Sequence, residues 1–501
     1  MNATRFAVVA SAILLPLLAP PAPAAETRSV TLEDCLQMAL EKNLDIRIQR
    51  LAPEIARATL SGSYGAYEPT FNAGASYRSV SQPGGVDAQN RPFGQALSKT
   101  ESINAGISGL LPLGTRYDLT LGYNDVFGSR DLGGFPLGFE NTAGGFRLSF
   151  SQPLLRNFWV DGPRLNIQLS RKNLAISELT LRQQIIATVT AVELAYLEVI
   201  AARETIAVSE VALQLAEQLL RENQKRVEVG VLAPLDEKEA QSQVAASRAS
   251  LLGAQNNLSI RLNQLKSLLG DQFVSWHDTE LVPAEPLRAE PMTFSLQDSW
   301  SKAVTLRPDL QQAKLDLERR QITLKYQKNQ LFPQLDLTGS YGQGGSGREF
   351  SDAFTVTRDG SYPEYSFGVV LSVPLGGNRR ARSDVRATQA QIEQALLGLK
   401  KLEQDILVQV SDGIAQARTS YQQVKATEEA AAYALEALRA EEKKLENGKS
   451  TSFQVLQLQR ILTERRFANI RARVDYNAAL ARLAQSEGST LERRRINLEI
   501  R

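Results

Sequence analysis

Two stretches of the chain carry an apolar residue at every seventh position. Residues 164–228 contain neither glycine nor proline, and residues 378–447 contain no proline and only two glycines. A sustained seven-residue repeat predicts helices that pack against neighbouring helices as in a coiled coil. At 1.5 Å per residue each helix would be on the order of 100 Å long, too long to fit inside a globule. The repeat runs through Ile185, Val192, Val199, Ile206, Leu213, Leu220 and Val227, and through Leu396, Val410, Ala417, Val424, Ala431, Leu438 and Leu445, with Glu403 as the one polar member.

Each long helix is predicted to end at a glycine and to turn back on itself. Gly230 and Gly448 interrupt the helical pattern, which then resumes as far as Gly270 and Gly488. Glycine adopts the left-handed conformation that ends a helix, and Pro234 is suited to begin the next one. We therefore expect two antiparallel helical hairpins, over residues 156–270 and 378–488.

Alternating polar and apolar residues precede each hairpin. The stretches are PTFNAGASY and GGFRLSFSQPL in the first half, and PQLDLTGSY and YSFGVVLSVPL in the second. Strict alternation predicts β-strands, here about ten residues long, which is the length of a transmembrane strand. We expect strands at about 69–80, 145–154, 333–343 and 363–375, with a helix of about 35 residues before Pro69 and before Pro333.

The first half has room for one more hairpin. Pro69 and Pro153 are 84 residues apart, whereas the corresponding Pro333 and Pro374 are only 41 apart. Two alternating stretches flank a Pro-Leu-Gly turn within residues 102–124. This hairpin either joins the sheet or folds into an external loop, and the similarity of the Pro112 turn to the other strand-end prolines favours the sheet.

The two halves of the chain are a tandem duplication. LEDCLQMALEKNLDI aligns with LQDSWSKAVTLRPDL, and VEVGVLAPLDEKEAQ aligns with LENGKSTSFQVLQLQ. The same alignments pair Leu32 with Leu296 and Gly230 with Gly448. Internal repeats of this kind indicate one structural plan used twice.

Composition restricts the function further. Residues 1–25 have the basic start, the short apolar run and the small residues of a cleaved signal peptide. No later segment is apolar enough for a membrane helix, since the most apolar one contains Glu193 and Glu198. Any membrane contact must then use β-strands. Cys35 is the only cysteine, and the net charge of +2 does not suggest a nucleic-acid partner.

Nothing in the sequence indicates an enzyme. His277 is the only histidine, which excludes a histidine triad or a histidine metal site within one chain, and no phosphate-binding loop or CxxC pair occurs. We expect no cofactor. His277 falls in the linker 271–292, where a surface position is expected, and the basic run NRRARSDVR is expected to be a solvated helix start near the membrane.

These features together resemble the TolC-like outer-membrane efflux proteins, over essentially the whole mature chain. The resemblance rests on the duplicated plan, on GVLAPLDEKEAQ and GKSTSFQVLQLQ after the long helices, and on the helix ends LNQLKSLLG and LARLAQSEG. It implies a mainly α fold with a transmembrane β-barrel and a coiled-coil α-barrel in the periplasm, assembled as a homotrimer. The repeats would span residues 26–270 and 293–488, with a tail at 489–501. Six strands per chain would give the trimer about 18 strands in place of the family's usual 12.

The resemblance also implies a function. The protein would be the exit duct of a tripartite efflux pump or type I secretion system in the cell outer membrane, working with a periplasmic adaptor and an inner-membrane transporter of the RND, ABC or MFS type. It would conduct small molecules or polypeptides passively. The alternative is a structural tether of the same coiled coils without a lumen.

The resemblance implies two groups of functional residues, found at the positions of this sequence that match the family's. The resemblance assigns the helical turns to adaptor docking and the residues that follow them to a periplasmic gate. Relatives set acidic residues and an arginine where this chain has glutamines and a serine, so we expect a gate that closes by packing and hydrogen bonds more than by salt bridges. The docking residues are Val229, Gly230, Val231, Asn447, Gly448 and Lys449, and the gate residues are Gln454, Gln457, Asp236, Glu239 and Ser450.

Overall fold

The computed structural model describes residues 27–86, 88–132, 135–270, 276 and 279–497. The expected signal peptide and His277 lie outside these residues. The chain divides into two compact units, and each unit takes segments from both halves of the duplication. The first unit comprises the described parts of residues 1–44, 188–292 and 416–481, and the second those of residues 45–187, 293–415 and 482–501.

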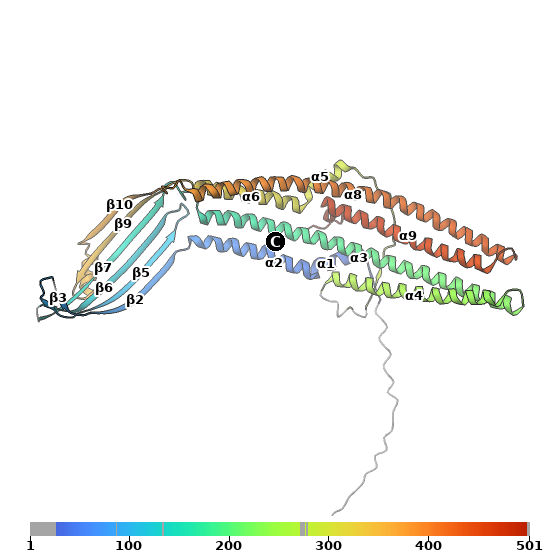
Figure 1. The fold of residues 1–501 in the computed structure, drawn as a ribbon, viewed down its shortest axis with the longest axis horizontal. Helices are drawn as coiled ribbons and strands as arrows, with labels where there is room; N and C mark the ends of the chain where they lie inside the picture. Colours follow the sequence, from blue (N-terminus) through green and yellow to red (C-terminus); the bar gives the residue numbers. More distant parts are fainter. Residues whose placement is uncertain (1–26, 87, 133–134, 271–275, 277–278, 498–501) are drawn as a thin grey trace, which may run out of the picture. The chain divides into compact units, whose positions relative to one another are not determined.

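The chain is mainly helical, with one large sheet (Figure 1). The helices are α1 (Leu32–Lys42), α2 (Leu44–Ser63), α3 (Gly162–Glu228), α4 (Pro234–Leu269), α5 (Leu296–Leu306), α6 (Pro308–Asn329), α7 (Phe350–Arg358), α8 (Arg379–Glu446), α9 (Ser452–Glu487) and α10 (Thr490–Arg493), with a 3₁₀ turn at Tyr64–Tyr67. The strands are β1 (Thr27–Val30), β2 (Thr70–Gln82), β3 (Gly85–Val86), β4 (Pro92–Phe93), β5 (Ala96–Leu110), β6 (Arg116–Leu132), β7 (Phe135–Pro153), β8 (Glu280–Pro283), β9 (Gln334–Gly347) and β10 (Pro363–Ser372).

The large sheet lies in the second unit and has six antiparallel strands in the order β10-β9-β7-β6-β5-β2. The hairpin expected near residues 102–124 is formed by β5 and β6, which extend beyond it at both ends and lie inside the sheet between β2 and β7. Within the described residues the sheet therefore has two edges, β2 and β10, that no other strand covers.

The two faces of this sheet differ in polarity. Residues paired directly across strands share a face, so the register assigns each side chain to one side. One face carries large exposed apolar side chains on every strand, namely Phe71, Tyr77, Ile103, Ile107, Leu119, Leu121, Leu148, Phe150, Leu337, Tyr341, Tyr365, Phe367, Val369 and Leu371. The opposite face carries residues such as Asn72, Ser102, Asn104, Asp118, Thr120, Arg147, Ser149, Thr338, Ser340 and Glu364. This pattern is typical of strands with lipid on one side and water on the other.

The long helices lie where the seven-residue repeat predicts them. Val410, Ala417, Val424, Leu438 and Leu445 are all buried, as are Ile185, Val192 and Val199. Each fully buried valine, leucine or isoleucine side chain contributes about 1.5–3 kcal/mol to stability. Leu396, by contrast, is exposed in the single chain.

By length and composition, α3 is the one described helix that could cross a membrane, because it contains an apolar stretch of 18 residues. However, 67% of that stretch is buried within the chain. Glu193, inside the stretch, is itself buried. Burial of this kind is typical of a core helix.

Three details differ from the sequence-based expectation. The first helical hairpin begins at Gly162 and not at residue 156, because Asn157 and Trp159 have positive φ angles, which a helix cannot accommodate. The helices of about 35 residues before Pro69 and Pro333 are each broken, at Asn43 and at Arg307, where the backbone is extended. The expected tail, residues 489–501, includes the short helix α10. The expected linker, residues 271–292, includes β8, which pairs in parallel with β1.

The two helix breaks do the same job in the two halves. Asn43 Nδ2 donates a hydrogen bond to the Leu268 carbonyl (2.8 Å), close to the end of α4. Arg307 Nη1 donates to the Ser486 carbonyl (3.0 Å), at the equivalent place in α9. Carbonyls at helix ends lack partners within the helix, so each break supplies a cap for a returning helix. Different side chains thus fulfil one duplicated role.

Candidate functional site

The two turns that join the long helices have the same backbone geometry. At the first turn Gly230 has φ 77°, its N–H donates to the Val227 carbonyl (3.0 Å), and the N–H of Val231 donates to the Arg226 carbonyl (2.8 Å). This pair of bonds is the Schellman motif, which satisfies carbonyls at a helix end.

The second turn repeats the motif. Gly448 has φ 71°, its N–H donates to the Leu445 carbonyl (3.1 Å), and the N–H of Lys449 donates to the Lys444 carbonyl (2.8 Å). A Cβ on either Gly230 or Gly448 would meet nothing within 4 Å. The backbone angle, and not lack of space, therefore requires glycine at both turns.

The six expected docking residues are all exposed, but the two turns differ chemically. Val229 and Val231 are each 72% exposed, and Leu235 just beyond them is 68% exposed. The second turn instead presents the polar side chains of Asn447 and Lys449. One turn thus offers an apolar surface and the other a polar, cationic one.

The expected gate residues follow these turns on α4 and α9. Gln454 and Gln457 are exposed, whereas Asp236, Glu239 and Ser450 are half-buried. In the described part of a single chain, the acidic pair on α4 and the glutamines on α9 make no hydrogen bond with one another.

Ser450 belongs to a local network at the second turn. Its hydroxyl lies 2.6 Å from Glu441 Oε1 and 3.0 Å from Gln454 Oε1. Lys444 Nζ is 2.9 Å from Glu441 Oε2. The hydrogen bond from Ser450, followed by that from Lys444, lowers the pKa of Glu441. This network involves a single hairpin, so it secures the turn itself.

Asn223 connects the two hairpins and was not anticipated from the sequence. Its side chain is fully buried, and its Nδ2 donates to Ser452 Oγ (2.6 Å) on α9 and to the Asp236 carbonyl (3.3 Å) on α4. It lies three residues after Leu220 of the seven-residue repeat, at a core position of the coiled coil. A polar residue at such a position was the available signal, since buried amides at these positions commonly fix the pairing of helices.

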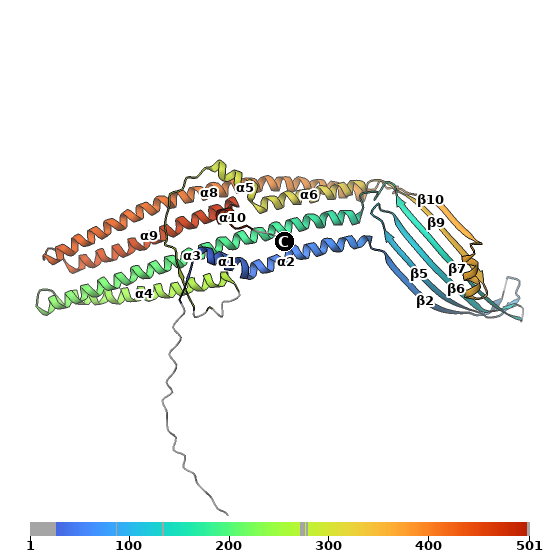
Figure 2. The same ribbon diagram turned by 180° about the vertical axis from the view of Figure 1, so that it is seen from behind.

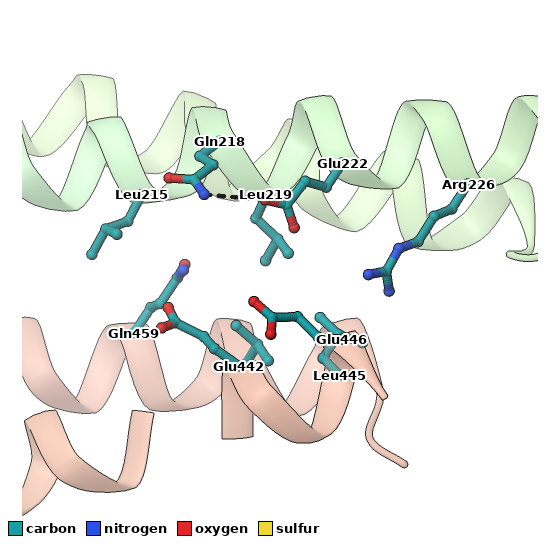
Figure 3. A pocket seen from close by; sticks show the side chains of 10 residues that line it. Leu215, Gln218, Leu219, Glu222, Arg226, Glu442, Leu445, Glu446 and Gln459 are labelled. Carbon is teal, nitrogen blue, oxygen red and sulfur yellow. Dashed lines mark hydrogen bonds between the residues drawn. The ribbon is translucent and has the colours of Figure 1, made fainter. Parts of the chain in front are cut away.

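A groove between α3 and the second hairpin is lined by several carboxylate side chains (Figure 3). Glu222 on α3 faces Glu442 and Glu446 on α8, with Arg226 beside them. Burial, then the charges of Glu222 and Glu446, raises the pKa of Glu442. Like charges are therefore held close together across the seam between the two hairpins.

A two-faced sheet and a pair of long coiled-coil hairpins are the parts of an outer-membrane channel that extends into the periplasm. The chain belongs to the outer membrane efflux protein family, whose model matches residues 118–271 and 300–489. It is accordingly an outer-membrane protein of the efflux class, and this family is a family of transport proteins and not of enzymes.

Individual relatives agree with this assignment. Outer membrane protein OprJ of Pseudomonas aeruginosa is 26% identical over 285 residues, which cover 57% of each chain. Outer membrane protein TolC of Vibrio cholerae is 24% identical over 393 residues, or 78% of this chain and 85% of TolC. The chain thus aligns with little more than half of OprJ but with most of TolC.

Solved structures share the fold. A membrane protein from Pseudomonas aeruginosa superposes with a TM-score of 0.67 at 22% identity, covering 91% of this chain and 93% of that one. The outer-membrane channel OprN gives a TM-score of 0.66 at 16% identity, covering 92% and 90%.

Proposed function

We propose that three copies of the chain assemble into a channel through the outer membrane, the exit duct of a tripartite efflux pump or type I secretion system. The observation that carries this proposal is the six-stranded sheet with one apolar face, one polar face and two unpaired edges. Six strands cannot close into a barrel with an aqueous lumen, whereas three copies would contribute about 18. Pairing β10 of one copy with β2 of the next satisfies the edges, places the polar faces inside and exposes the apolar faces to lipid.

The duct would conduct passively, moving small molecules or polypeptides delivered by an inner-membrane transporter of the RND, ABC or MFS type. No cofactor takes part. The long helices of three copies would form a periplasmic α-barrel, because their seven-residue repeats require neighbouring helices.

Current through a planar bilayer tests the conducting function. The purified detergent-soluble oligomer should give single-channel steps. A structural tether with the same coiled coils would insert without steps, and that result would replace the duct with the tether.

We propose in addition that the two exposed turns dock a periplasmic adaptor, and that the residues behind them form the gate. The exposure of Val231 and Lys449 supports docking. A photo-crosslinker on Val231→Cys or on Lys449→Cys should capture an adaptor in intact cells, whereas the same label on Arg78→Cys, on the polar face of the sheet, should not. Equal capture from all three positions would refute docking at the turns.

A further inference from the structure

The connection between β9 and β10 folds into a helix that lies on the apolar face of the sheet. Figure 2 shows α7 against the strands at the end opposite to their junction with α6. Ala353 and Thr357 of α7 are buried. Phe350 meets Tyr123 edge to face, with ring centroids 4.9 Å apart, and the register places Tyr123 on the apolar face.

The sheet is built to receive this helix. A Cβ on Gly345 would collide with the Ala353 carbonyl, and a Cβ on Gly347 would collide with Asp352. The buried Thr142 hydroxyl lies 3.3 Å from the Arg348 carbonyl and so fastens the start of the connection to β7. The glycines and the threonine make α7 a fixed part of the fold, because the helix can approach this closely only over bare backbone.

The surface of α7 is divided between polar and aromatic side chains. Ser351, Thr355 and Arg358 are exposed on the side away from the sheet, whereas Asp352, also exposed, lies at the edge of the contact, over Gly347. Phe350 and Phe354 stack on each other, with centroids 6.1 Å apart, and remain 54% and 47% exposed on the flank of the helix. The phenylalanines thus continue the apolar surface of the strands, while the outer side of α7 needs water or lipid headgroups.

The tyrosines of the strands indicate the depth in the membrane at which α7 lies. Tyr341 of β9 pairs with Tyr365 of β10 on the apolar face, near the end where α7 begins. Tyrosines are enriched where a barrel leaves the hydrocarbon and enters the headgroups. Further from α7 along β10, Phe367, Val369 and Leu371 lie on the same face and are all exposed, as expected for the hydrocarbon band.

We propose that α7 is an interfacial helix that lies in the headgroup layer of the outer leaflet, with Phe350 and Phe354 inserted at the boundary of the hydrocarbon. Its polar outer side excludes a position deeper in the membrane, where a charged side chain is costly. Its partner is the lipid surface, and its role is to fix the height of the sheet in the membrane. The inference rests on the proposed insertion of the sheet in the bilayer.

Labelled cysteines can test separately the position of α7 and the insertion of the sheet in the bilayer. Cys35 is buried, and burial raises the pKa of its thiol to about 12, so introduced cysteines can be labelled alone. We would attach an environment-sensitive fluorophore to Phe354→Cys, to Phe367→Cys in the middle of β10, and to the control Ser346→Cys, which lies beside Gly345 but on the polar face. The oligomer is reconstituted in vesicles of phosphatidylethanolamine and phosphatidylglycerol with a doxyl-labelled phosphatidylcholine.

A doxyl group near the headgroup should quench the label at Phe354→Cys several-fold, and one deep in the acyl chain should quench it little. The label at Phe367→Cys should show the reverse order, and Ser346→Cys should respond only to aqueous iodide. If the doxyl lipid quenches the label at Phe367→Cys, but the label at Phe354→Cys is quenched by iodide instead of lipid, the interfacial helix would be overturned and the barrel would remain intact. A label at Phe354→Cys that neither quencher reaches would mean that protein covers α7, which also overturns the proposal. Absence of lipid quenching at all three positions would refute the inserted sheet itself.

Discussion

At the scale of single residues, the glycines of this chain serve two distinct physical needs. Gly230 and Gly448 supply a left-handed backbone where no atom stands within reach of a Cβ. Gly345 and Gly347 supply space, since a helix lies directly over them. The sequence indicates the first use, because glycine after a long helical pattern predicts a helix end. It does not indicate the second, which depends on a segment folding back on the sheet.

Gly448→Ala should destabilise the chain by about 1 kcal/mol, because an L-residue is strained at positive φ. Gly253→Ala is the matched control: Gly253 is inside α4 with open space around it, and alanine there should stabilise by about 0.5–1 kcal/mol. Unfolding midpoints of the two variants in detergent should move in opposite directions. A shift of the same sign in both would contradict the conformational role of the turn.

Two neighbouring glutamates should respond to pH with opposite signs. The pKa of Glu442 is raised, so its ionisation disfavours the folded state, and stability is lost as pH rises through the window between the ordinary and the raised value. Glu442→Gln should therefore stabilise the protein at neutral pH and have little effect in acid. The pKa of Glu441 is lowered, so its contribution is present above the ordinary value and is lost as pH falls. Glu441→Gln should destabilise at neutral pH, and denaturation midpoints at acid and neutral pH check both signs.

At the scale of elements, the sequence predicts best what local periodicity determines. The seven-residue repeat places α3 and α8, the helical pattern that resumes after Gly230 and Gly448 places α4 and α9, and period-two alternation places the six long strands. The breaks at Asn43 and Arg307 escape such reasoning, because the side chains there cap carbonyls more than 170 residues away in the chain. The helix α7 escapes it as well, because nine residues between two strands give too short a pattern.

The seam between the hairpins depends on Asn223, and its removal is the sharpest test of that element. Asn223→Ala should cost about 1–3 kcal/mol, because it removes two hydrogen bonds and leaves buried groups unpaired. Hydrogen exchange at the start of α9 should rise.

Gln224→Ala is the control, since the side-chain hydrogen bond that Gln224 makes within the described residues goes to Glu237 of its own hairpin (3.4 Å). If both variants loosen α9 equally, Asn223 has no special role in holding the hairpins together.

At the scale of the whole molecule, the duplicated plan yields a sheet that is incomplete in one chain and helices that require neighbours. Both features favour assembly, and both follow from a pattern visible in the sequence. The proposed gate is less predictable, since within the described part of one chain its residues form no hydrogen bond from one hairpin to the other. In the proposed trimer, side chains from other copies would complete it.

At the proposed gate, Gln454 and Gln457 would place amides where an acidic ring would bind divalent cations, so we expect channels of this protein to resist block by these ions. Gln454→Asp should make periplasmic-side current sensitive to sub-millimolar Mg²⁺ or Ca²⁺ by supplying carboxylates around the pore, and Gln454→Asn should leave it insensitive. Planar-bilayer recording measures all three. Block of the unaltered channel at such concentrations would show that acids elsewhere, such as Asp236, line the constriction.

The uncovered edges β2 and β10 also have a genetic consequence. Every seam of the proposed trimer joins one edge of each kind, so each subunit takes part in two seams and no seam is spare. In a cell that makes normal and edge-damaged chains in equal amounts, random assembly would leave only about one trimer in eight free of a damaged seam. A mutation confined to either edge strand should therefore behave as dominant, whereas loss of the whole gene copy should be recessive.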